Sequence, residues 1–166
     1  AQGKVEAGSR VDLARSMIGM SVRKGTPKPD ISTVDALKQT LLDAKTIAYS
    51  ASASGTYLAN ELFPRLGVAE QMKGKATRIL SERVGAVVLR GDADIGFQQV
   101  SELLPFKELE FVGPLPDEVQ QRVFFSAGVA TGAKSPDTAR HLIRFLAAPA
   151  AAPIVRSTGM EPAAKP

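Results

Sequence analysis

The stretch Ile47-Ala48-Tyr49-Ser50-Ala51-Ser52-Ala53-Ser54-Gly55-Thr56-Tyr57-Leu58 decides how this 166-residue sequence is interpreted. It begins like a buried strand and passes through small hydroxyl residues into a helix. Ser, Thr and Gly at a helix start leave backbone N–H groups open, and these groups attract anions. No residue between Lys45 and Glu61 carries a formal charge. The stretch predicts a cradle of neutral dipoles for a small anion, with ligand-binding residues Ser52, Ser54, Gly55 and Thr56.

Strands and helices alternate on both sides of this stretch. Apolar runs and turn residues predict strands over residues 17–23, 46–49, 77–80, 94–99, 109–112 and 122–130. Helical patterns cover residues 33–44, 54–66 and 82–90, and two helical pieces follow Ser135. This alternation indicates an α/β fold with a mostly parallel sheet and helices on both faces.

Ligands of such sheets bind beyond the carboxyl ends of the strands, and two polar groups are predicted there. The first is the serine-rich turn after Tyr49, and the second is Gln98 with Gln99, which follow Phe97. Amides at a strand end orient polar ligands through donor and acceptor geometry. Two alternatives stay open, namely a helix-capping role for the serines and a loop-tying role for the glutamines.

Composition limits the classes of function. Hydrophobic residues make up 44% and charged residues 23%, as in ordinary globular proteins, and no apolar run approaches the length of a membrane-spanning helix. The net charge is +4, but the basic residues are dispersed and aromatic residues amount to only 5%. Nucleic-acid binding is therefore not expected, because it relies on basic patches and stacking platforms.

Catalytic constellations are sparse in this sequence. There is no cysteine, and the single histidine, His141, stands between Arg140 and Arg144 on a predicted helix. Ser54 as a nucleophile would need an activating base that the neighbouring residues do not offer. Asp92, Asp94 and Glu102 could serve as acid, base or metal ligands, but solvated carboxylates are the more ordinary interpretation. We expect no enzymatic activity, no cofactor and no metal.

Several segments, in their order and spacing, resemble periplasmic substrate-binding proteins, and the molybdate-binding branch most closely. These segments are Val11–Ser16, Ile18–Gly25, Lys28–Thr33, the Ser54-Gly55-Thr56 cradle, Gly91–Gly96, and Phe145-Leu146 with Gly159. The resemblance implies a type II periplasmic binding fold, in which two lobes close on a ligand. It also implies that the ligand meets backbone N–H groups at Ser54-Gly55-Thr56 and near Val84. A tyrosine position of the family is held here by Gln98 or Gln99.

The resemblance also implies a division of the chain. Residues 1–24 would hold a remnant of the first lobe and the first crossing strand, and residues 25–121 would form a complete second lobe. Residues 122–166 would return through a second crossing strand to the helices of the first lobe. That lobe would be partial, because its opening elements would precede Val11. Apolar surface exposed by a partial lobe invites pairing, so a homodimer is expected.

The predicted function is that of the periplasmic solute-binding component of an ABC transporter. Its ligand would be a small oxyanion such as molybdate, or another small polar anion, and its protein partner would be the transporter permease. A ligand-sensing domain of a transcriptional regulator uses the same fold and is the alternative.

Overall fold

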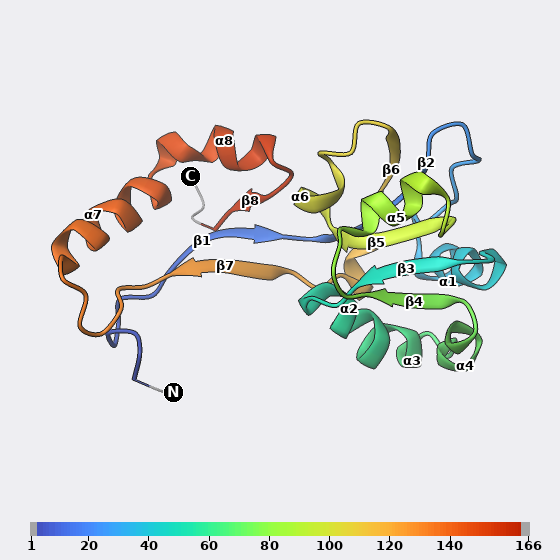
Figure 1. The fold of residues 1–166 in the computed structure, drawn as a ribbon, viewed down its shortest axis with the longest axis horizontal. Helices are drawn as coiled ribbons and strands as arrows, with labels where there is room; N and C mark the ends of the chain where they lie inside the picture. The colour runs from blue at the N-terminus through green and yellow to red at the C-terminus, as the bar shows by residue number, and fades with distance from the viewer. Residues whose placement is uncertain (1–2, 164–166) are drawn as a thin grey trace. The chain divides into compact units, whose positions relative to one another are not determined.

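The computed structural model describes residues 3–163, and its elements are drawn in Figure 1. The chain divides into two compact units. Residues 17–122 form one, which we name the central unit, and residues 1–16 and 123–166 belong to the other, the terminal unit.

The central unit is built on a five-stranded sheet with the order β4-β3-β5-β2-β6. Its strands are β2 (Ile18–Arg23), β3 (Ile47–Ser50), β4 (Ala76–Ile79), β5 (Ile95–Gln99) and β6 (Leu109–Pro114). β3 pairs in parallel with β4 and β5, whereas β2 runs antiparallel to β5 and β6. The α/β class is confirmed. The sheet is mixed because β2, inserted between β5 and β6, runs against the other four strands.

Helices cover both faces of this sheet. They are α1 (Val34–Asp43), α2 (Ala53–Tyr57), the π-helix η1 (Leu58–Leu62), α3 (Phe63–Arg65), α4 (Ala69–Lys73), α5 (Val84–Arg90), α6 (Val100–Leu103) and the 3-10 helix η2 (Asp117–Val119). On one face, Phe97 packs in a large apolar cluster with Leu58 and Leu37. On the other, Ala48 packs with residues of α5 such as Val88. Alternate strand residues thus serve two cores, as the pleat requires.

The helical segment from Ala53 to Arg65 is distorted ahead of Pro64. Proline has no N–H to donate within a helix and crowds the preceding turn. The chain responds with a π turn, in which Phe63 N–H donates to Leu58 O, five residues earlier. The segment therefore stays helical across the proline.

The terminal unit contains an antiparallel three-stranded sheet with the order β7-β1-β8. Its elements are β1 (Val11–Ser16), β7 (Val123–Ala127), α7 (Pro136–Ala147), the 3-10 helix η3 (Pro149–Ala151), α8 (Ala152–Ser157) and β8 (Glu161–Pro162). β7 pairs with β1, and the strand over residues 18–23 lies inside the central sheet. The domain boundaries inferred from the family resemblance stay a prediction.

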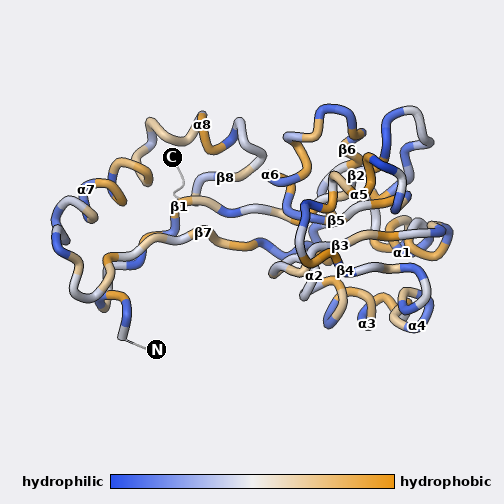
Figure 2. The backbone as a smooth tube through the Cα atoms, in the orientation of Figure 1, coloured by the Kyte–Doolittle hydropathy of each residue, from blue (hydrophilic) through white to orange (hydrophobic). Residues whose placement is uncertain are grey.

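Hydrophobic residues recur along α7 and α8 (Figure 2). Several of them are exposed, including Phe145 at 73% and Ile154 at 70%. None of the helices within residues 3–163 combines the length and apolar character that a bilayer crossing requires.

Candidate functional site

Three parallel strands of the central unit end at one edge of its sheet. Ser50 ends β3, Ile79 ends β4 and Gln99 ends β5, and in the register Ser50 pairs with Ile79 and Tyr49 with Phe97. We name this the carboxyl edge. It is where ligands of α/β sheets bind, and it holds both predicted groups of polar residues.

A triangle of serine hydroxyls lies at the carboxyl edge. The Oγ atoms of Ser50 and Ser52 are 2.7 Å apart, those of Ser50 and Ser54 are 3.0 Å apart, and those of Ser52 and Ser54 are 3.2 Å apart. Ser50 and Ser54 are buried, while Ser52 is exposed. A hydroxyl has one donor and two acceptor sites, so the triangle can rotate one proton outward to an anion.

Gly55 lets the start of α2 lie directly against the end of β3. A Cβ added at Gly55 would sit 1.6 Å from the Ser50 carbonyl oxygen, so no side chain fits there. The next residue, Thr56, is exposed, and its N–H donates to Ser52 O over 3.0 Å. Thr56 belongs to the predicted cradle, but its N–H group is already used in a hydrogen bond within the helix.

Gln98 and Val84, both expected to contact a ligand, contact each other. The Gln98 Oε1 atom accepts a buried hydrogen bond of 3.0 Å from Val84 N–H. Because Val84 is the first residue of α5, this bond ties the helix to the end of β5. Gln98 thus links two structural elements, which was the alternative to ligand binding considered for the glutamines.

Gln99 has no such partner. Its side chain is only 4% exposed, yet neither its Oε1 nor its Nε2 atom has a hydrogen-bond partner within residues 3–163. It lies two residues after Phe97 and so on the same face of the sheet, where Phe97 packs with Leu58. An unpaired buried amide costs about 1–3 kcal/mol. Gln99 is the member of the predicted site whose hydrogen-bonding capacity is free for a ligand.

Glu102 stands one turn beyond Gln99 in α6. It is partly buried, and its Oε2 atom also has no hydrogen-bond partner among the described residues. The sequence indicated Glu102 only as one of several carboxylates, since nothing in its local pattern shows that one oxygen is enclosed.

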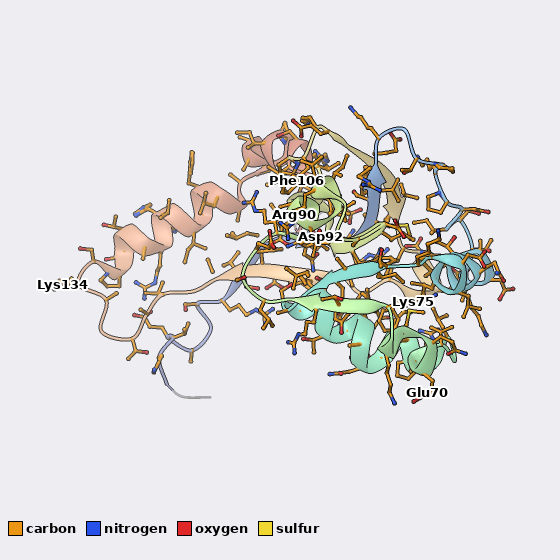
Figure 3. The ribbon with its side chains drawn as sticks, turned by 45° about the vertical axis from the view of Figure 1, so that its right-hand side comes forward. Glu70, Lys75, Arg90, Asp92, Phe106 and Lys134 are labelled. Carbon is orange, nitrogen blue, oxygen red and sulfur yellow. The ribbon has the colours of Figure 1, made fainter. Side chains whose placement is uncertain are left out.

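One arginine side chain lies at this edge, and another forms ion pairs with the residues that flank α5. The Arg78 Nη2 atom donates to Ala51 O over 3.1 Å, and Arg83 precedes α5. Arg90 Nη1 binds Glu82 Oε2 over 2.7 Å and its Nε binds Asp92 over 2.5 Å; Figure 3 shows Arg90 with Asp92. The Arg90 guanidinium lowers the pKa of Glu82 below its ordinary value.

The contacts of Arg90 neutralise Glu82 and Asp92, whereas Arg78 lies outside every ion pair that the structure shows for residues 3–163. Arg78 was not predicted as a site residue from the sequence. It lies in β4, paired with Tyr49 in the sheet but 29 positions later in the chain.

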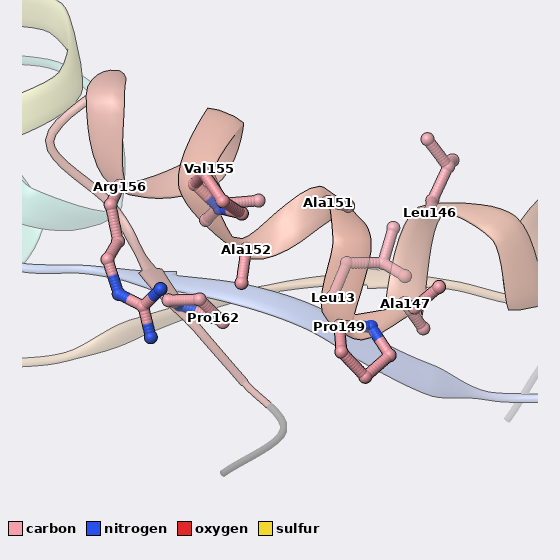
Figure 4. A pocket seen from close by; sticks show the side chains of 11 residues that line it. Leu13, Leu146, Ala147, Pro149, Ala151, Ala152, Val155, Arg156 and Pro162 are labelled. Atoms are coloured by element: carbon pink, nitrogen blue, oxygen red, sulfur yellow. The ribbon is translucent and has the colours of Figure 1, made fainter. Parts of the chain in front are cut away.

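The terminal unit has a pocket of its own, shown in Figure 4. It measures about 180 Å³ and lies between β1 and α8, where its lining includes Leu13, Val155 and the charged Arg156. No predicted site residue lines it. Within residues 3–163, no three His, Cys, Asp or Glu side chains gather as a metal site would require.

A family described as bacterial extracellular solute-binding protein matches residues 1–161. The chain belongs to this family. An aconitate isomerase from a Pseudomonas species is 46% identical over 162 residues, which are 98% of this chain and 62% of that protein. The chain therefore spans less than two thirds of this relative.

Solved structures confirm the fold. The substrate-binding domain of a putative molybdenum ABC transporter from Clostridium difficile matches with a TM-score of 0.73 at 20% identity, over 95% of this chain and 68% of that one. The periplasmic molybdate-binding protein of Azotobacter vinelandii matches with 0.71 at 19% identity, over 99% and 71%. The resemblance is confirmed at the level of the extracellular solute-binding family and of the fold shared with molybdate-binding proteins. A homodimer finds no support in these comparisons.

One prediction is wrong. The sequence suggested a protein without enzymatic activity, but the aconitate isomerase relative is an enzyme. The sequence carries neither a nucleophile with an adjacent base nor a metal-binding cluster, the patterns by which many enzymes are recognised. An isomerase that only relocates a proton needs a single positioned acid–base group, and one carboxylate leaves no such pattern in a sequence.

Proposed function

We propose that this chain belongs to a periplasmic protein that binds aconitate and interconverts its isomers. Two findings support the proposal: the relative that is 46% identical, and the free polar groups of the carboxyl edge. The single observation that carries it is Gln99, a buried amide whose donor and acceptor both await a partner.

The chemistry of the edge suits a carboxylate ligand. A carboxylate accepts hydrogen bonds at both oxygens, and the hydroxyl triangle of Ser50, Ser52 and Ser54 together with Gln99 Nε2 offers donors. Aconitate carries three carboxylates, so it also needs positive charge nearby, and Arg78 supplies it beside Ala51.

The test uses the full-length protein with cis-aconitate and trans-aconitate. Proton NMR follows conversion of either isomer, and calorimetry compares their binding with that of molybdate and sulfate. We expect conversion in both directions and tighter binding of aconitate than of either oxyanion. If the protein neither converts nor binds aconitate, the proposal is contradicted.

The matched variants are Gln99→Leu and Gln39→Leu. Gln39 lies exposed on α1, where its Nε2 donates to Asp43. Gln99→Leu is expected to weaken aconitate binding about tenfold or more, the effect of losing one or two hydrogen bonds to a charged group. Gln39→Leu is expected to bind as the wild type does.

The family favours a second candidate, a receptor that delivers a small anion to an ABC transporter permease. Binding without turnover in the same titrations would select it, and preference for molybdate over aconitate would specify its ligand.

A further inference from the structure

The isomerisation requires a group that moves a proton, and this inference rests on the proposed function. Aconitate has a methylene carbon beside its carbon–carbon double bond. A base takes one methylene proton, the electron pair left behind forms a new double bond, and the former double-bond pair accepts a proton at the far carbon. The double bond has then moved by one carbon, and the isomers interconvert with no oxidant, metal or co-reactant. One base that returns its proton is sufficient.

Cysteine, histidine and the buried Tyr57 do not supply this base in the central unit. The sequence has no cysteine, and its one histidine, His141, lies exposed in α7 of the terminal unit. The Tyr57 hydroxyl donates to Val119 O over 2.9 Å, and burial raises the pKa of Tyr57. It therefore stays protonated near neutral pH and cannot act as the base.

Most carboxylates of the central unit already have partners or lie in solvent. Those in ion pairs are Glu70, Glu82, Asp92, Glu110 and Asp117. Those that accept other hydrogen bonds are Asp30 and Asp43, and those exposed without such a bond are Asp35, Glu61, Glu108 and Glu118. Asp94 precedes β5 and so lies at the opposite end of the strand from Gln99.

Glu102 remains, and its position is at the carboxyl edge. β5 ends at Gln99, Gln99 is the N-cap of α6, and Glu102 follows three residues later within that helix. Residues three apart around a helical turn are neighbours, so the two side chains serve one region. Both carry buried polar atoms without partners, namely the Gln99 amide and Glu102 Oε2. An enclosed carboxylate oxygen without a donor destabilises the fold, which calls for a reason other than stability.

We infer that Glu102 is the catalytic base, which takes the methylene proton of aconitate and returns it to the far carbon. Gln99 holds a carboxylate of the substrate beside it. Glu102 is suited to this task because no cation neutralises it within residues 3–163 and one of its oxygens is shielded from water.

The test compares Glu102→Gln with wild type in the full-length protein, by proton NMR of aconitate conversion. Glu102→Gln keeps the size and hydrogen-bonding capacity of the side chain but cannot take a proton at neutral pH. We expect kcat to fall about 100-fold or more, with KM changed less than threefold and an unchanged melting temperature. Glu108→Gln is the matched control, since Glu108 is an exposed glutamate of the same unit that precedes β6. It is expected to keep the wild-type rate.

Chemical rescue separates proton transfer from a structural role. In Glu102→Ala, added formate is expected to restore part of kcat, because a small carboxylate can enter the space left by the side chain. An active wild type with a Glu102→Gln variant of equal kcat would overturn the inference and leave the proposed function intact. A raised KM or a lowered melting temperature in Glu102→Gln, together with no rescue of Glu102→Ala by formate, would also overturn the inference. An inactive wild type would refute the isomerase function itself.

Discussion

Apolar side chains are used differently in the two units. Both core clusters lie within the central unit, where Leu58 and Leu37 have no exposed surface. In contrast, seven of the nine large apolar side chains that are exposed among the described residues belong to the terminal unit: Val5, Phe124, Phe125, Leu142, Phe145, Leu146 and Ile154. The central unit encloses its own core, whereas the terminal unit leaves most of its large apolar side chains exposed.

The candidate site lies in the central unit, which encloses its own core. The serine triangle, Gln99 and Glu102 all lie between residues 50 and 102, on elements that pack around the central sheet. A binding edge held by a closed core keeps its geometry without help from the terminal unit.

The largest effect is expected when the two units are expressed separately. Residues 17–122 expressed without the rest are expected to fold cooperatively, because both core clusters remain complete. Residues 123–166 expressed separately are expected to stay unfolded. Circular dichroism on heating and two-dimensional NMR would check both, and a non-cooperative central fragment would contradict the comparison.

Core truncation comes next in size. Leu58→Ala removes a side chain with 0% exposure from the larger cluster, and is expected to lower the free energy of unfolding by about 2–5 kcal/mol. Phe145→Ala removes a larger side chain that is 73% exposed. It is expected to change the free energy of unfolding by less than about 0.5 kcal/mol. Urea denaturation measures both, and equal losses would show that Phe145 is buried in solution.

Glycine substitutions test the close approach at the carboxyl edge. Gly55→Ala would place its Cβ 1.6 Å from Ser50 O, so we expect a cost of about 1–3 kcal/mol and weaker ligand binding. Gly74→Ala is the control, because nothing lies within 4 Å of its added Cβ. Thermal unfolding and calorimetry on the two variants would check this. If Gly55→Ala behaved like Gly74→Ala, the start of α2 would not rest on β3.

The smallest effect concerns pH. Burial raises the pKa of Tyr57 above its ordinary value of 10.0, so the folded state keeps the proton longer than the unfolded state. Stability from this source is complete below about pH 10 and is lost as pH rises toward the folded-state pKa. Tyr57→Phe should cost about 1 kcal/mol at neutral pH through the lost bond to Val119 O.

The same variant should also show a weaker decline above pH 10, measured by urea denaturation across that range. An unchanged decline in Tyr57→Phe would assign the alkaline effect to other groups.

Local signals in the sequence determined the elements whose hydrogen bonds close nearby. Thr33, at the start of the predicted helix over residues 33–44, accepts a hydrogen bond from Ala36 N–H, and Leu37 and Leu41 of this helix lie in the core. The Ser50–Ser54 triangle likewise spans only five residues. A capping residue and a helical period are properties of the nearest neighbours, so a sequence displays them.

Only the tertiary structure decided what depends on distant segments. β1 was not predicted as a strand, and β8, which pairs with it, contributes Glu161 to an ion pair with Arg15, 146 positions earlier. In the same way, the register of β5 with β3 and β2 gives Gln98 a partner in Val84 and leaves Gln99 without one. Adjacent glutamines look alike in a sequence. They differ here because the pleat sends their side chains to opposite faces of the sheet, and long-range packing sets what each face contains.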